Sequence, residues 1–136
     1  MADFFRADYE KYGYFNLHYV LINLYYQYIF YPLPFRQESA MGGSLFLMSP
    51  LFFAAMTALW KPREKMLVWA LLGSIFVTNI PILLCMGTGF VQYGPRYTLD
   101  FTVPLLLLTA LGMQRWHPAI SALLATISAA TYIVGF

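Results

Sequence analysis

Charged residues are scarce in this chain, and their scarcity argues against a soluble fold. Asp, Glu, Lys and Arg make up 10% of the 136 residues, whereas soluble domains carry about 25%. Hydrophobic residues make up 60%, and the mean hydropathy is +0.62. The net charge is only +2 and no basic cluster is interleaved with aromatic residues, so we expect no nucleic-acid partner. Lipid is therefore the expected solvent for most of the chain.

Cysteine, histidine and clustered carboxylates are also rare, which excludes several kinds of site. The single cysteine, Cys85, permits no disulfide within the chain. His18 and His117 are far apart and have no Cys or carboxylate at ligand spacing, so we expect no metal or haem site. The sequence contains no Ser/His/Asp or Cys/His set and no glycine-rich phosphate loop. We therefore identify no catalytic residue and no cofactor site.

Long apolar stretches are what the sequence does contain. Four of them approach the roughly 20 residues that a helix needs to cross a bilayer. They cover residues 44–60, 66–86, 95–113 and 119–136. In lipid such a stretch must be helical, because its backbone polar groups have to bond within the segment. We therefore predict an all-α, polytopic membrane helical bundle with four transmembrane helices in residues 44–136, preceded by an external tail in residues 1–43.

Lys and Arg in the short loops predict the orientation of this bundle. Cytoplasmic loops carry an excess of these residues. The loops after the first and third spans contain Lys61, Arg63, Lys65 and Arg115, whereas the opposite side has only Arg36 and Arg96 close to the membrane. We predict that the loops with Lys61, Lys65 and Arg115 are cytoplasmic, and that the tail and the loop at 87–97 face outward. Two interior prolines, Pro81 and Pro104, predict kinks in the second and third spans.

Residues 12–31 are uncharged and rich in aromatic side chains. Tyr prefers the water–lipid boundary, and Asn16, Asn23 and Gln27 fall on one face of a helix over this stretch. A narrow polar stripe beside a broad aromatic face suits an amphipathic helix that lies on the membrane, which is our prediction for residues 12–31. The alternative is a fifth span, which would place the N-terminus in the cytoplasm and make the chain self-contained.

The densest polar feature precedes the third span and contains Arg96, Tyr97 and Asp100. Arg96 and Asp100 are four residues apart, which puts them on one face of an α-helix, although this order of charges is the less favourable one. One hypothesis is that Arg96 holds a lipid-linked phosphate, which a guanidinium binds well. The alternative is that Arg96 pairs with Asp100 or extends to lipid headgroups.

The order of motifs resembles a late segment of bacterial multi-span glycosyltransferases of the C superfamily, which include protein-mannosyltransferase and lipid A aminoarabinose-transferase relatives. At 89–108 the pair Arg96-Tyr97 precedes a proline-interrupted, leucine-rich span. Earlier matching motifs are Tyr12-Gly13-Tyr14-Phe15-Asn16-Leu17-His18-Tyr19, Asn23-Leu24-Tyr25-Tyr26, Gly43-Ser44-Leu45 and Ser49-Pro50. The similarity extends over about residues 8–112 and would cover only the C-terminal part of a full-length member. Asp100 is a departure, because many members place proline there.

This resemblance implies that the chain is the C-terminal membrane portion of a protein of the bacterial inner membrane that uses a polyprenyl-phosphate-linked sugar donor. Arg96, Tyr97 and Asp100 would line the donor site. The family's catalytic carboxylate lies in the first external loop of a complete enzyme, and nothing here corresponds to it, so we expect the chain to be inactive alone.

The implied partners are membrane lipids, the sugar donor and a missing N-terminal membrane region. The alternative function is a small non-enzymatic scaffold or accessory subunit of a transporter or lipid-handling complex, in contact with a partner membrane subunit. A proton- or ion-coupled transporter is disfavoured, because no ionisable residue lies in the middle of any predicted span.

Overall fold

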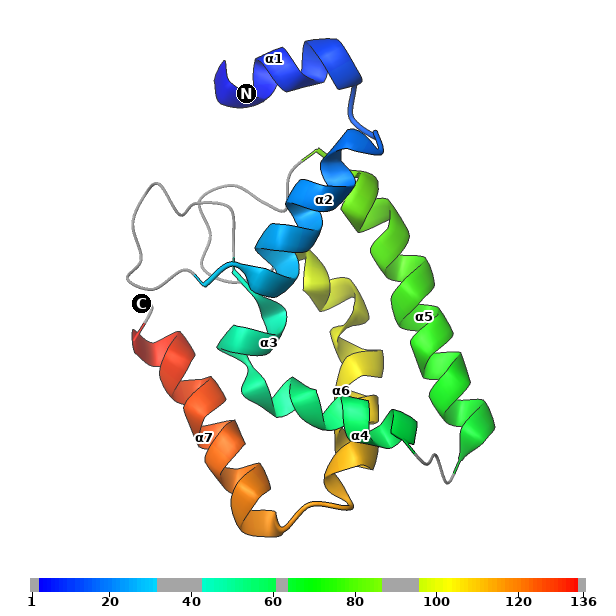
Figure 1. Ribbon diagram of the computed structural model, residues 1–136, viewed down its shortest axis with the longest axis vertical. Helices are drawn as coiled ribbons and strands as arrows, with labels where there is room; N and C mark the ends of the chain where they lie inside the picture. Colours follow the sequence, from blue (N-terminus) through cyan, green and yellow to red (C-terminus); the bar gives the residue numbers. More distant parts are fainter. Residues whose placement is uncertain (1–2, 32–42, 61–63, 87–95, 135–136) are drawn as a thin grey trace.

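Helices are the only named elements in the part of the chain that the structure, a computed structural model, describes: residues 3–31, 43–60, 64–86 and 96–134. In chain order they are α1 (Asp3–Tyr12), α2 (His18–Leu24), the π-helix η1 (Tyr25–Ile29), α3 (Leu45–Met48), the 3-10 helix η3 (Pro50–Phe53), α4 (Ala54–Trp60), α5 (Lys65–Leu84), the 3-10 helix η4 (Arg96–Phe101), α6 (Thr102–Met113) and α7 (Pro118–Val134). Figure 1 shows their arrangement. The predicted all-α class is confirmed.

The helix α5 corresponds to the predicted span at 66–86. It has 20 residues and a mean hydropathy of 2.1, and it is the one helix among the described residues that is long and apolar enough to cross a membrane. Pro81 lies near its end, and the helix stops at Leu84. The other three predicted spans coincide with shorter apolar helices.

The predicted span at 44–60 is wrong as a single helix. Ser49, with φ −129° and ψ 73°, separates α3 from η3, and η3 leads directly into α4. The ring of Pro50 accounts for this break, because a proline disfavours the helical conformation for the residue before it. In Figure 1 the chain changes direction between α3 and α4.

The third predicted span, 95–113, is divided between η4 and α6. Phe101 at their junction has φ −116° and ψ 12°, so α6 begins at Thr102. Pro104 therefore falls in the first turn of α6, where a missing N–H removes no intrahelical bond. The kink predicted for Pro104 is thus replaced by a break three residues earlier. The fourth predicted span corresponds to α7, which begins at Pro118.

The tightest packing in the core is between α4 and α6. Ala54 and Ala58 are buried on α4, and they face α6, where Gly112 is also buried. The hydroxyl of Thr57 donates to the carbonyl oxygens of Ala54, at 2.7 Å, and Gly112, at 3.1 Å. Small residues allow two helix backbones to approach this closely.

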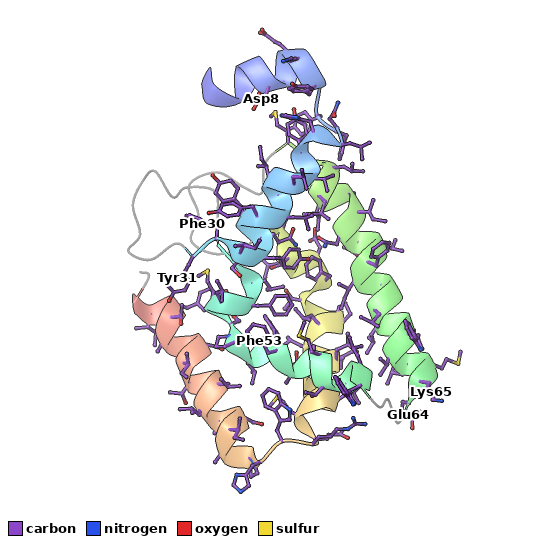
Figure 2. All side chains as sticks on the ribbon, in the orientation of Figure 1. Asp8, Phe30, Tyr31, Phe53, Glu64 and Lys65 are labelled. Atoms are coloured by element: carbon purple, nitrogen blue, oxygen red, sulfur yellow. The ribbon has the colours of Figure 1, made fainter. Side chains whose placement is uncertain are left out.

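Charged residues lie at both ends of the molecule. Figure 2 shows Glu64 and Lys65 at one end and Asp8 at the other. Arg115 lies at the Lys65 end, since its Nη1 atom donates to the carbonyl oxygen of Thr57 in α4 at 3.4 Å. Lys65 and Arg115 therefore share one end, as the orientation prediction requires, whereas Lys61 lies outside the described residues.

The segment 12–31 does not form one continuous helix. Its tyrosine-rich start belongs to α1 and to a turn, and the helical run of α2 and η1 covers 7 and 5 residues. At 1.5 Å per residue this run is about 18 Å long, well short of the roughly 30 Å hydrocarbon core. The fifth-span alternative is therefore not supported, and α2 instead packs against α5.

Candidate functional site

Two amides of the predicted polar stripe are buried inside the chain. The exposed fractions of Asn23 and Gln27 are 0% and 3%. They lie one turn apart, Asn23 on α2 and Gln27 on η1. Because α2 packs against α5, polar groups of α5 come within reach of both amides. The prediction that these side chains form a stripe at the membrane surface is therefore wrong. Buried polar groups require hydrogen-bond partners, and α5 supplies them.

Asn23 caps the C-terminal end of α5. Its Nδ2 atom donates to the carbonyl oxygens of Leu83 and Cys85, both at 2.8 Å, and approaches that of Ile82 at 3.4 Å. The last carbonyl groups of a helix have no partner within the helix. The side chain from α2 therefore stabilises the point at which α5 ends.

Gln27 joins η1 to the interior of α5. Its Nε2 atom donates to Asn79 Oδ1 at 3.0 Å and to the Tyr28 hydroxyl at 3.3 Å. Asn79 Nδ2 donates to the same hydroxyl at 2.7 Å. The Ser44 hydroxyl donates to the backbone carbonyl of Tyr28 at 2.6 Å, which ties the start of α3 to η1. These four residues and Asn23 form what we call the amide cluster.

Asn16, the third residue of the stripe, lies outside the amide cluster. Its Nδ2 atom donates to the Tyr12 carbonyl oxygen at 3.2 Å, and its Oδ1 atom accepts from the backbone N–H of His18 at 2.9 Å. These local bonds organise the turn before α2. Helical periodicity places Asn16, Asn23 and Gln27 on one face, but in the fold Asn16 organises a turn while Asn23 and Gln27 bond to α5.

Sequence reasoning missed the parts that Tyr28, Ser44 and Asn79 play. One signal for Asn79 was available, because it is the only side-chain amide in the stretch 66–86. A lone amide in an apolar span requires a polar partner, but the sequence does not say which residue supplies it.

The amide cluster retains unused acceptor capacity. Asn23 Oδ1 and Gln27 Oε1 are buried and have no hydrogen-bond partner among the described atoms. Such an oxygen costs about 1–3 kcal/mol unless a donor reaches it. Amides do not titrate near neutral pH, so these two side chains can orient a hydrogen-bond donor but cannot act as an acid or a base.

Arg96, Tyr97 and Asp100 lie in η4. A 3-10 helix has three residues per turn, so residues three apart are aligned. Tyr97 and Asp100 therefore share a face and both are exposed. The predicted common face of Arg96 and Asp100 assumed an α-helix, whereas the backbone here forms the 3-10 helix η4. The side chain of Arg96 lies outside the described parts of the structure.

Cys85, the single thiol, follows the last residue of α5 and is partly buried. Burial raises the pKa of the Cys85 thiol. This shift favours the protonated thiol, which is the less nucleophilic form. Among the described residues, no group of three His, Cys, Asp or Glu side chains is arranged to hold a metal ion.

Comparisons with protein-family models, with curated proteins and with solved structures found no match to this chain.

Proposed function

We propose that the chain is a membrane protein in which α5 crosses the bilayer, and that it forms the C-terminal membrane portion of a glycosyltransferase-like protein that uses a polyprenyl-phosphate-linked sugar donor. The observation that carries the membrane part is the exposed apolar surface of α5. Met66, Trp69, Phe76 and Val77 are 89%, 69%, 69% and 68% exposed. Soluble proteins rarely expose apolar patches of this extent. A helix of this length spans about 30 Å, the thickness of a hydrocarbon core.

Hydroxyl groups along the helices support the same reading. Many of them donate to the carbonyl oxygen four residues earlier in the chain, as an apolar solvent requires. These residues are Thr78, Thr102, Thr109, Thr126, Ser128 and Thr131, with donor–acceptor distances between 2.8 and 2.9 Å. Their bonds need no water.

We propose that three further segments also cross the membrane and form a four-span bundle with α5: α3 to α4, η4 with α6, and α7. The six residues of η4 and the twelve of α6 together extend for about 30 Å, because a 3-10 helix rises further per residue. The break between α3 and η3 is covered by protein, since Met48 and Ser49 are buried. Ser128 of α7 accepts a hydrogen bond from the Leu51 N–H at 3.4 Å. Irregular backbone at membrane depth requires such cover.

Membrane integration is directly testable. We expect the expressed chain to stay in the membrane pellet after alkaline carbonate washing and to enter solution only with detergent. A variant with Phe76→Lys and Val77→Lys should show reduced insertion, because each lysine at a helix centre costs about 2.5–3.5 kcal/mol. The control places two lysines at the start of α5 instead, with Glu64→Lys and Met66→Lys. Release of the unmodified chain by carbonate would contradict the proposal.

The sugar-donor part is supported by the family resemblance and by the exposed face of η4. We place Arg96, Tyr97 and Asp100 at the outer side of the membrane, opposite the end that holds Lys65 and Arg115. Arg96 would bind the donor phosphate, while Tyr97 and Asp100 present a hydroxyl and a carboxylate on one face of η4. The catalytic carboxylate would come from the region upstream.

The donor role of Arg96 can be tested in a protein that also carries the upstream membrane region. In an assay of transfer from a lipid-linked sugar, we expect Arg96→Ala to lower kcat/KM about tenfold to a hundredfold, because a hydrogen bond to a charged group contributes about 1.5–3 kcal/mol. Lys65→Ala, a change of an exposed cation at the opposite end, is the matched control. Equal activity of the two variants would remove the donor role.

An accessory membrane subunit is the second candidate function, and α7 is the observation that favours it. Ala125 and Ala129 on this helix are exposed, and small residues of this kind let a neighbouring helix pack closely. A self-contained subunit with a cytoplasmic N-terminus would need residues 12–31 to cross the membrane, which the short run of α2 and η1 does not support. A cysteine introduced at Ala7 that reacts only from the cytoplasm would overturn this reading and favour that subunit, whereas reaction only from outside would favour the glycosyltransferase-like protein.

A further inference from the structure

The turn between α1 and α2, residues 13–17, is bonded to the C-terminal end of α5. The backbone N–H of Asn16 donates to the Leu84 carbonyl oxygen at 3.0 Å, and that of Met86 donates to the Tyr14 carbonyl oxygen at 2.9 Å. Phe15 and Cys85 form an antiparallel bridge between these bonds. We call residues 13–17 the corner. Its depth along the molecule is therefore tied to the point at which α5 ends.

The corner also holds α1 in place. Gly13 has φ +73°, a conformation that turns the chain out of α1 and that glycine adopts without strain. The buried Tyr19 hydroxyl on α2 donates to the carbonyl oxygens of Gly13, at 2.9 Å, and Asp8, at 3.2 Å. The rings of Tyr12 and His18 stack with centroids 4.1 Å apart. Figure 1 shows α1 running across the end of the molecule, crosswise to α5.

Large apolar side chains of the corner are exposed at the surface, where the backbone bonds to α5 hold them. Tyr14, Phe15 and Leu17 are 51%, 63% and 78% exposed. The exposed charges of Glu10 and Lys11 lie just before them on α1. Aromatic and aliphatic side chains beside charges are the composition of segments at the water–lipid boundary.

We propose that the corner is a membrane-surface anchor, in which Tyr14, Phe15 and Leu17 enter the boundary between headgroups and acyl chains while α1 lies along the surface. The inference rests on the proposed crossing of the bilayer by α5. A helix of about 30 Å fills the hydrocarbon core from end to end, so Leu84 lies at its edge. The corner is bonded to Leu84 and Met86 and shares that depth, which makes lipid its partner.

The anchor can be tested by measuring depth in vesicles. Single cysteines are introduced at Phe15, Leu17, Glu10 and Phe76 in a Cys85→Ser background and labelled with an environment-sensitive fluorophore. The protein is reconstituted in phosphatidylcholine vesicles with nitroxide-labelled lipids. At positions 15 and 17 we expect quenching roughly twofold stronger from a headgroup nitroxide than from one deep in the acyl chain, since about 15 Å separates the two depths.

The two controls define the scale. The probe at position 10 should be quenched by aqueous iodide, and the probe at position 76, in the middle of α5, by the deep nitroxide. If position 76 is deep while positions 15 and 17 are as open to iodide as position 10, the anchor is refuted and the crossing by α5 stands. Deep quenching at 15 and 17, or shielding from both lipid and iodide, also refutes the anchor. Iodide access at position 76 refutes the crossing itself.

Discussion

Gly112→Ala should lower the free energy of unfolding by about 2–3 kcal/mol or more, since overpacking at a tight contact costs this much. A Cβ atom at position 112 would collide with the carbonyl oxygen of Ala54 and would lie 2.7 Å from Thr57 Oγ1. The first of these atoms belongs to the backbone, so α4 and α6 would have to separate. The separation would also weaken the hydrogen bond from Thr57 to the Gly112 carbonyl oxygen. Unfolding in mixed detergent micelles, followed by circular dichroism, measures the change.

Gly73→Ala is the matched control for this prediction. Gly73 lies inside α5, and a Cβ atom there would meet nothing within 4 Å. Alanine is favoured over glycine in a helix by roughly 0.5–1 kcal/mol, so this variant should be slightly more stable than the original chain. The same substitution thus has opposite signs at the two positions. Similar stabilities for the two variants would mean that α4 and α6 do not cross at Gly112.

Asn23→Leu should lower the free energy of unfolding by about 3 kcal/mol, because it removes the donor of buried carbonyl groups at about 1–3 kcal/mol each. The carbonyl oxygens of Leu83 and Cys85 lose bonds of 2.8 Å. Leucine keeps the branched outline of asparagine, and its bulkier methyl groups add to the loss at this fully buried site. We also expect faster hydrogen exchange in the last turn of α5. The same detergent titration and an exchange experiment provide the measurements.

Leu21→Ala is the control on the same helix. Leu21 is 79% exposed, and surface substitutions away from special features usually change stability by less than about 0.5 kcal/mol. A loss for Asn23→Leu no larger than that for Leu21→Ala would show that α2 does not cap α5.

Local sequence information was sufficient to predict the helical class and to place α5 and α7. The apolar run at 66–86 has no competing turn signal, and backbone groups in an apolar solvent must bond within their own segment. α5 accordingly begins and ends close to the predicted positions. α7 begins at Pro118, one residue before the predicted stretch 119–136, and a proline in the first helical turn forfeits no bond. Pro50 is a local signal for the break at Ser49, but the apolar run at 44–60 is long enough to favour one continuous span.

The face on which the amides lie was predictable, but the surface they contact was not. Helical periodicity places Asn23 and Gln27 together, and polarity alone favoured water or headgroups as their partner. Asn23 instead bonds to carbonyl groups about 60 residues later in the chain, and Gln27 bonds to Asn79. Helical periodicity relates residues a few positions apart, so it cannot predict partners this distant in the sequence.

The amino-acid sequence by itself determined that the chain is helical, where α5 runs, and that lipid is its expected solvent, because these depend on composition and on bonds between residues a few positions apart. Only the tertiary structure decided that α2 caps α5, that η4 aligns Tyr97 with Asp100, and that α1 lies across the end of the molecule. These arrangements depend on hydrogen bonds and close contacts between distant segments, such as those of Asn23, Gln27 and Gly112. Their geometry exists only once the chain has folded.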